Sequence, residues 1–241
     1  MQKINAKAII FDKDGTLLEF DPFWISVSQS AITKLLNKFE VSQNKKESCL
    51  TAIGLKDGVV DSDGVLCTGT YGEIAEVLFE IFNSQKTILD KKQFESECIK
   101  SFHDSIPEGV VLPTSKDLCD TLKALKDRGI KLFVVTSDDK KTTEVCLKGL
   151  KIENLFEKVI TDDGVHPHKP HPYYAQSIMK DYNLSESQVV MVGDTLTDTE
   201  FAKNSNIKCV GLAKTEQAKS LLQGNATIVV SDLSLLTEII G

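Results

Sequence analysis

The sequence predicts an α/β fold, in which a doubly wound parallel sheet forms the core and a mainly α-helical module is inserted after the first strand. Short apolar runs alternate with helical patterns after residue 107, and one further run stands near the N-terminus. This alternation is typical of parallel sheets covered by helices. Residues 20–106 interrupt it with helical patterns and no strong strand. The 241 residues are enough for a core and a smaller accessory domain.

The predicted strands are apolar runs bounded by charged or turn-forming residues. The first, Ala8–Phe11, lies between charged residues and an Asp-Gly turn, which suits a short strand buried on both faces. The later runs have the same character. They cover residues 131–135, 158–160, 189–192, 208–211 and 227–230.

Helical patterns separate these strands. Leucines recur at helical spacing over 118–125, with Thr114 or Ser115 as the expected N-cap and Gly129 as the expected end. Further core helices are predicted over 173–182, 199–203 and 217–222.

The inserted module is predicted to be helical because residues 23–39 form a long amphipathic pattern, followed by shorter ones. Pro107, Gly109 and Pro113 mark the expected return of the chain to the sheet. The expected helices are 23–39, 74–82 and 94–102, with a weak strand at Val59–Val60. We therefore expect a core domain of residues 1–19 and 107–241, and an inserted domain of residues 20–106.

Composition narrows the functional classes. A formal net charge of −7 argues against non-specific nucleic-acid binding, which needs a basic face. The six cysteines are scattered and form no C-x-x-C pair, so a zinc ribbon is not expected. Ala8–Phe11 is too short for the apolar part of a signal peptide, and no stretch approaches a membrane span. We expect a cytoplasmic protein with reduced thiols and neither a nucleic-acid nor a membrane partner.

Polar residues follow the predicted strands at the edge where open α/β sheets bind ligands. In chain order they are Asp12 and Asp14, Thr136 and Ser137, Lys169, and Gly193, Asp194 and Asp198. Carboxylates, a hydroxyl and a cation are therefore expected to gather at one edge of one sheet.

These residue types suit phosphoryl transfer. Asp12 and Asp14 are two residues apart in an extended segment, so both point the same way, and one can be a nucleophile and the other a proton donor. An anionic nucleophile meeting a phosphate needs a hard cation, and Mg²⁺ accepts carboxylate oxygens such as those of Asp194. Lys169 can neutralise charge on the phosphate, and Thr136 can donate to a phosphoryl oxygen.

The ordered set Asp12-Lys13-Asp14-Gly15-Thr16, Thr136, Lys169 and Gly193–Asp198 resembles the four motifs of the haloacid dehalogenase (HAD) superfamily. The inserted helical module resembles the cap domain of that superfamily by position and helical character. Within the superfamily the chain is most similar to the phosphoglycolate-phosphatase-like branch.

The resemblance implies a role for each motif residue. Asp12 would attack phosphorus to form an aspartyl-phosphate, and Asp14 would protonate the leaving group and then activate water. Mg²⁺ would be bound by the Asp12 carboxylate, the Asp14 backbone carbonyl and Asp194, with Asp198 in or just outside the metal shell. Phosphate-binding residues would be Gly15, Thr16, Thr136, Ser137 and Lys169.

The implied activity is that of a Mg²⁺-dependent phosphatase acting on a small phosphorylated metabolite, either phosphoglycolate-like or a sugar phosphate monoester. A phosphomutase of the β-phosphoglucomutase type is the alternative. A phospho-accepting signalling protein is a third reading, and the inserted module and the second acidic motif argue against it. The natural substrate and the oligomeric state are not readable from the sequence.

Two further patterns have competing interpretations. Asp61 and Asp63 belong to a second D-x-D-G in a glycine-rich stretch, which indicates a turn in the inserted module or a loop that reads the substrate. His166, His168 and His171 surround Lys169, but prolines interrupt their spacing. They are expected in a solvated or substrate-facing loop rather than in a zinc site.

Three residues beside the predicted site residues receive no catalytic role. Lys13 lies where the family varies, so the resemblance assigns it nothing. Asp138 and Asp139 are expected to be a helix cap and a first-turn acid.

Overall fold

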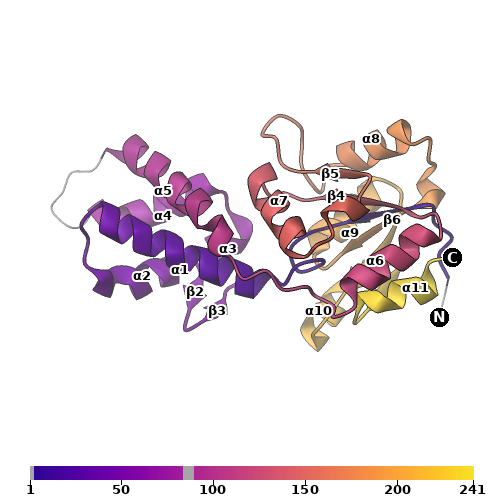
Figure 1. Ribbon diagram of the computed structural model, residues 1–241, viewed down its shortest axis with the longest axis horizontal. Coiled ribbons are helices and arrows are strands. Elements are labelled where there is room, and N and C mark those ends of the chain that lie inside the picture. Colours follow the sequence, from indigo (N-terminus) through magenta and orange to yellow (C-terminus); the bar gives the residue numbers. More distant parts are fainter. Residues whose placement is uncertain (1–2, 84–89) are drawn as a thin grey trace. The chain divides into compact units, whose positions relative to one another are not determined.

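The computed structural model describes residues 3–83 and 90–241, and the chain forms two compact units (Figure 1). One unit comprises Met1–Glu19 and Leu112–Gly241, and the other comprises Phe20–Val111. Residues 107–111, which the sequence assigned to the core, group with the helical unit in the structure. Among the described residues, no helix has the length and apolar character needed to cross a bilayer.

The first unit is built on a six-stranded parallel sheet with the strand order β5-β4-β1-β6-β7-β8. The predicted α/β class is confirmed, and each of the six apolar runs forms a strand. The central strand β1 lies between β4 and β6, so residues that follow these three strands are neighbours. The strands are β1 Ala8–Phe11, β4 Lys131–Val135, β5 Lys158–Ile160, β6 Val189–Gly193, β7 Lys208–Leu212 and β8 Ile228–Val230.

Helices cover both faces of this sheet (Figure 1). Ile9 and Phe11 of β1 pack in a core with leucines of α6, α7 and α11, whereas Ala8 and Ile10 pack in a second core with α8 and α9. Successive residues of a strand point to opposite faces, so this fully apolar strand is buried on both. The helices are α6 Leu118–Asp127, α7 Lys140–Gly149, α8 Tyr173–Asp181, α9 Leu196–Asn204, α10 Glu216–Leu222 and α11 Leu236–Ile239.

The sequence predicted the positions of these helices better than the residues that cap their ends. Neither Thr114 nor Ser115 caps α6, because both side chains bind elsewhere: Ser115 Oγ donates to Asp232 Oδ1 at 2.9 Å, and the Thr114 hydroxyl donates to the Thr16 carbonyl. Gly129 follows the end of α6 with a φ of +80°, as a C-terminal glycine should. Asp139 caps α7 by accepting from the Thr142 N–H at 3.0 Å.

The second unit is mainly helical. Its aromatic core joins α1, α4 and α5, with the Phe82 and Phe94 rings 5.0 Å apart and both side chains buried. A two-stranded antiparallel hairpin accompanies these helices. The elements are α1 Phe20–Lys38, α2 Lys46–Ala52, β2 Leu55–Lys56, β3 Val59–Val60, α3 Val65–Thr68, α4 Tyr71–Asn83 and α5 Lys91–Ser105.

The second D-x-D-G forms a turn between β3 and α3. Asp61 Oδ1 accepts from the Asp63 N–H, and the Asp61 carbonyl accepts from the Gly64 N–H, both at 3.0 Å. A Cβ on Gly64 would lie 2.8 Å from the Gly54 Cα, so the glycine allows two backbone segments to meet. These contacts explain the motif by local structure, because side chains of this kind stabilise turns.

Candidate active site

Three predicted site residues follow neighbouring strands of the sheet. Asp12 follows β1, Thr136 follows β4 and Asp194 follows β6, and the register pairs Phe11 with both Val134 and Val192. The Asp12 N–H donates to the Val192 carbonyl at 2.9 Å, which extends the ladder into the site. Parallel pairing therefore brings Asp12 close to two residues that are each more than a hundred positions away in the sequence.

Lys169 connects two of the acidic residues. It lies in the loop between β5 and α8, and its buried Nζ is 2.6 Å from both Asp12 Oδ1 and Asp198 Oδ1. The second oxygen of Asp198 accepts from the N–H and the hydroxyl of Thr195, at 3.1 and 2.7 Å, at the start of α9. Asp198 thus uses both oxygens inside the protein, one to hold Lys169 and one to cap a helix.

A cluster of carboxylates surrounds Asp12. Oxygens of Asp12, Asp194 and Asp198 all lie within 4.8 Å of one another. Burial, opposed by Lys169 and reinforced by Asp198, raises the pKa of Asp12 to about 6. Burial and the charges of Asp12 and Asp198 raise the pKa of Asp194 well above its usual value. Two buried carboxylates, the half-buried Asp194 and one lysine leave uncompensated negative charge, so this oxygen donor set fits a hard divalent cation.

Gly15 and Thr16 lie beside the carboxylate of Asp194. Gly15 has a φ of +72°, and its N–H donates to the Leu18 carbonyl at 2.7 Å. Thr16 is fully buried, and its hydroxyl donates to Asp194 Oδ1 at 2.8 Å. The Gly15 N–H and the Thr16 hydroxyl therefore have protein partners, and the phosphate-binding role that the motif resemblance implies for both residues stays a prediction.

Asp14 lies beside an unpredicted buried cation. Lys13 Nζ is 2.7 Å from Asp14 Oδ2 and 2.8 Å from Asp138 Oδ2, and the Lys13 side chain is fully buried. Burial, opposed by Lys13 and reinforced by Asp138, raises the pKa of Asp14 to about 7. Asp138 therefore pairs with Lys13 and does not cap the following helix. Sequence reasoning missed this pair because nothing local to either residue indicates its partner.

The two hydroxyl candidates differ in burial. Thr136 is buried, and its Oγ1 accepts from the Asp138 N–H at 3.2 Å. A hydroxyl that accepts one hydrogen bond keeps its own hydrogen to donate. Ser137 is exposed. Thr136 is therefore the better placed of the two to donate from inside the site.

The three histidines around Lys169 differ in the contacts that their rings make. His166 stacks on Tyr173 with the ring centroids 4.7 Å apart, and its Nδ1 is 2.7 Å from Asp163 Oδ2. His171 Nδ1 accepts from the Tyr173 N–H at 3.2 Å, and His168 is exposed. In residues 3–83 and 90–241, the one group of three side chains suited to a metal is the acidic cluster around Asp12.

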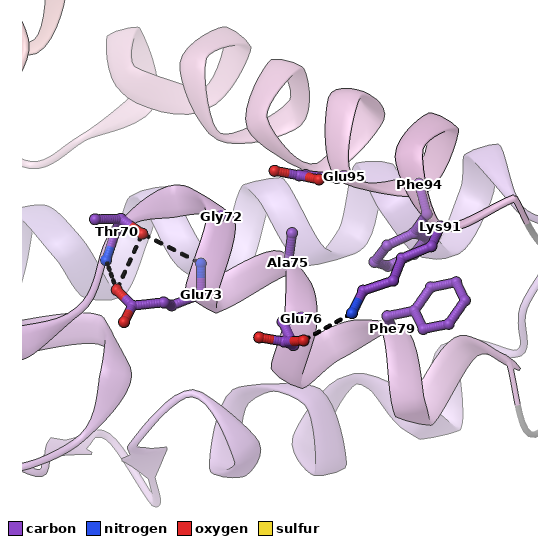
Figure 2. A pocket seen from close by; sticks show the side chains of 9 residues that line it. All are labelled: Thr70, Gly72, Glu73, Ala75, Glu76, Phe79, Lys91, Phe94 and Glu95. Carbon is purple, nitrogen blue, oxygen red and sulfur yellow. Dashed lines mark hydrogen bonds and ion pairs between the residues drawn. The ribbon is translucent and has the colours of Figure 1, made fainter. Parts of the chain in front are cut away.

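The helical unit carries a groove of about 290 Å³ between α4 and α5 (Figure 2). Several of its polar groups are paired with one another: Glu73 Oε2 accepts from Thr70, and Lys91 Nζ is 2.7 Å from Glu76 Oε1. The groove holds none of the predicted site residues. The chemistry therefore belongs to the sheet edge.

Comparison with known proteins agrees with this geometry. A family model described as haloacid dehalogenase-like hydrolase matches residues 67–212, more than half of the chain. The protein belongs to the haloacid dehalogenase-like hydrolase family. It is therefore an enzyme of the hydrolase class, as the motif resemblance predicted. The matched span includes Thr136, Lys169, Asp194 and Asp198.

Relatives extend the similarity over the whole chain of this HAD-like hydrolase. It is 28% identical to the pyrophosphatase PpaX of Bacillus mycoides over 99% of this chain and 100% of that protein. Its fold is similar to that of a predicted phosphoglycolate phosphatase from Haemophilus somnus, with a TM-score of 0.68, 20% identity and 97% of each chain covered. A HAD-superfamily hydrolase of subfamily IA from Geobacter sulfurreducens has a TM-score of 0.67 at 17% identity, covering 99% of this chain and 100% of its own.

Proposed function

We propose that this protein is a Mg²⁺-dependent phosphatase that hydrolyses a small phosphorylated metabolite through an aspartyl-phosphate on Asp12. The observation that carries the proposal is the contact of buried Lys169 with buried Asp12 inside a cluster of carboxylates at the sheet edge. A cation held 2.6 Å from one carboxylate oxygen orients Asp12 and offsets charge when a phosphate approaches. The order of the motifs and the family membership support the same chemistry.

The first half-reaction breaks the ester bond. An Asp12 carboxylate oxygen attacks phosphorus, and the bond between phosphorus and the ester oxygen breaks, which transfers the phosphoryl group to Asp12. Asp14 gives its proton to the departing oxygen, and this prevents the release of a strongly basic alkoxide. Lys169 and Thr136 donate to the phosphoryl oxygens. The products of this step are an alcohol and an acyl phosphate.

The second half-reaction restores the enzyme. Asp14, now ionised, accepts a proton from a water molecule as that water attacks the phosphorus of the acyl phosphate. The bond between phosphorus and the Asp12 oxygen breaks, and inorganic phosphate leaves. Asp14 is again protonated and Asp12 again ionised, so the cycle closes without a further reactant.

Mg²⁺ would be held by the carboxylates of Asp12 and Asp194 and by the Asp14 backbone carbonyl. Asp198 would lie outside the ligand shell, because Lys169 and Thr195 already occupy its two oxygens. Bound there, the cation would supply positive charge that lets two anions approach each other. Thr16 would hold Asp194 in place through its hydroxyl, and Gly15 leaves the room that this carboxylate needs.

The helical unit of residues 20–111 is proposed as the cap domain that chooses the substrate. We infer a phosphoglycolate-like or sugar phosphate monoester, and inorganic pyrophosphate is a second candidate because a relative covering almost the whole chain is a pyrophosphatase. Pyrophosphate releases phosphate as its leaving group and so depends less on the proton of Asp14. A phosphomutase would instead return the phosphoryl group to a sugar.

One screen tests the proposal. Purified protein is incubated with phosphate monoesters, pyrophosphate and a generic aryl phosphate, with Mg²⁺ or with EDTA, and released phosphate is measured. We expect Mg²⁺-dependent release that EDTA abolishes. Equal release in metal-free buffer would contradict the mechanism, and conversion of a sugar phosphate to its isomer without phosphate release would favour the mutase.

A further inference from the structure

A buried lysine lies beside the residue proposed to transfer the proton. Lys13 Nζ is 2.7 Å from Asp14 Oδ2, 2.8 Å from Asp138 Oδ2 and 3.8 Å from Cys146 Sγ, and no part of its side chain reaches solvent. We propose that Lys13, held by Asp138, is a positioning residue that fixes the Asp14 carboxylate for proton transfer. The proposal rests on the function proposed for Asp14.

The two oxygens of Asp14 have different surroundings. Oδ2 is anchored by Lys13, whereas Oδ1 is buried and has no hydrogen-bond partner among residues 3–83 and 90–241. Because a carboxyl that has one oxygen anchored cannot exchange its oxygens by rotation, Oδ1 is left as the atom that carries the transferred proton. Misplacing a catalytic group by about 1 Å can cost roughly 10²-fold in rate.

Asp138 holds the lysine from the neighbouring strand. It lies in the loop after β4, two residues beyond Thr136, and Cys146 contributes the third neighbour from α7. A fully buried ammonium must be paired, since leaving a buried charge uncompensated is strongly destabilising. Lys13 thereby joins the loop that carries the proton donor to the loop that carries the phosphate-binding hydroxyl.

The experiment asks whether Lys13 positions Asp14 or only stabilises the fold. The two roles differ in how the rate loss of a Lys13 variant depends on the leaving group of the substrate. We measure kcat/KM, which reports the step that forms the acyl phosphate, for dinitrophenyl phosphate, phenyl phosphate and an alkyl phosphate. A good leaving group departs without a proton, whereas an alkoxide needs one. Loss of a well-placed acid therefore slows the alkyl ester most.

Three variants are compared with the wild type. Asp14→Asn removes the acid itself and should lose about 10²-fold or more for the alkyl ester relative to the dinitrophenyl ester. Lys13→Met should show the same trend. Its loss of kcat/KM for the alkyl ester should be about tenfold or more greater than its loss for the dinitrophenyl ester. Lys158→Met is the control, because it breaks an exposed ion pair with Asp181 far from these residues in the sequence. It should leave the leaving-group dependence unchanged.

A double variant keeps the test decisive if Lys13→Met folds poorly. Lys13→Met leaves two carboxylates around an apolar side chain, whereas Lys13→Met/Asp138→Asn removes one of those charges. The melting temperature of the double variant should exceed that of Lys13→Met. Asp14 still lacks its anchor, so the steeper leaving-group dependence should persist although stability recovers.

The outcomes are distinct. A steep dependence in Asp14→Asn, Lys13→Met and the double variant supports the positioning role. A loss in Lys13→Met that is equal for all three esters, or a double variant that regains the wild-type dependence with its stability, overturns it. If the wild type shows no Mg²⁺-dependent hydrolysis, or Asp14→Asn slows all three esters alike, the proposed function itself fails and the role of Lys13 falls with it.

Discussion

The carboxylate of Asp194 occupies the space that a side chain on Gly15 would need. A Cβ built on Gly15 would lie 2.1 Å from Asp194 Oδ2 and 2.6 Å from its Cγ. Gly15 also has a φ of +72°, a backbone conformation that residues with a Cβ rarely adopt. The glycine of the first motif is therefore required twice, once by its backbone and once by the acid that approaches it.

Gly15→Ala should weaken Mg²⁺ binding because Asp194 must move away from the new methyl group. The strained backbone alone should cost about 1–2 kcal/mol of folding stability. The concentration of Mg²⁺ that gives half-maximal phosphatase activity should rise, and a Mg²⁺ titration measures it directly.

Gly129→Ala is the matched control for this variant. Gly129 has a similar φ of +80°, but a Cβ there meets nothing within 4 Å. The control should therefore lose comparable stability and keep its Mg²⁺ dependence. A Gly15→Ala protein that binds Mg²⁺ as well as Gly129→Ala would show that the contact with Asp194 does not matter.

Stability of the metal-free protein should fall as pH rises from about 5 to about 7. The carboxyls of Asp12 and Asp14 have pKa values raised from 3.8 to about 6 and about 7. In that window the folded state keeps protons that the unfolded chain has lost, so deprotonation favours unfolding. Carboxyls with lowered pKa values, such as Asp232, have finished titrating in the unfolded chain by about pH 5, so above that pH they contribute no slope of opposite sign.

Added Mg²⁺ should reverse this trend, because it binds the ionised carboxylates. The rise in melting temperature on adding Mg²⁺ should be small near about pH 5 and larger near about pH 7.5. Thermal melts at several pH values, with Mg²⁺ or EDTA, check both statements. A Mg²⁺ effect that is independent of pH would contradict the assignment of these carboxylates to the cation site.

Asp12→Asn should abolish turnover and leave the fold intact. The amide cannot form the acyl phosphate, yet it has the shape of the carboxyl and removes one of three mutually repelling charges. Lys169 keeps its contact with Asp198. Phosphate-release kinetics should show no turnover while circular dichroism matches the wild type. Near-normal turnover would exclude the covalent route.

Replacing both Asp61 and Asp63 by asparagine should leave hydrolysis of a generic aryl phosphate largely unchanged. The side-chain oxygen of an asparagine can still accept the turn-forming bond that Asp61 now accepts, so the turn should persist. If this loop reads the natural substrate, the loss should instead be seen on that substrate as a raised KM. A fall in aryl phosphate kcat as deep as that of Asp12→Asn would place this second motif in the catalytic machinery.

Local sequence patterns were enough to predict the strands of the sheet and the residues that follow them at its ligand-binding edge. The apolar runs are long enough to form strands and too short to form buried helices. They predict β1, β4 and β6. Parallel strands end at one edge, so Asp12, Thr136 and Asp194 were placed together without any distance being known. Local rules suffice where the position of a residue depends only on the strand that precedes it.

The pairing of the polar side chains, in contrast, depends on the packed fold. Lys13 meets Asp138, both oxygens of Asp198 are engaged by Lys169 and Thr195, and Ser115 binds Asp232 instead of capping its helix. Each of these partners, Thr195 apart, is distant in the chain. A buried polar side chain pairs with whatever donor or acceptor packing brings within reach, and no property of its sequence neighbours encodes that choice.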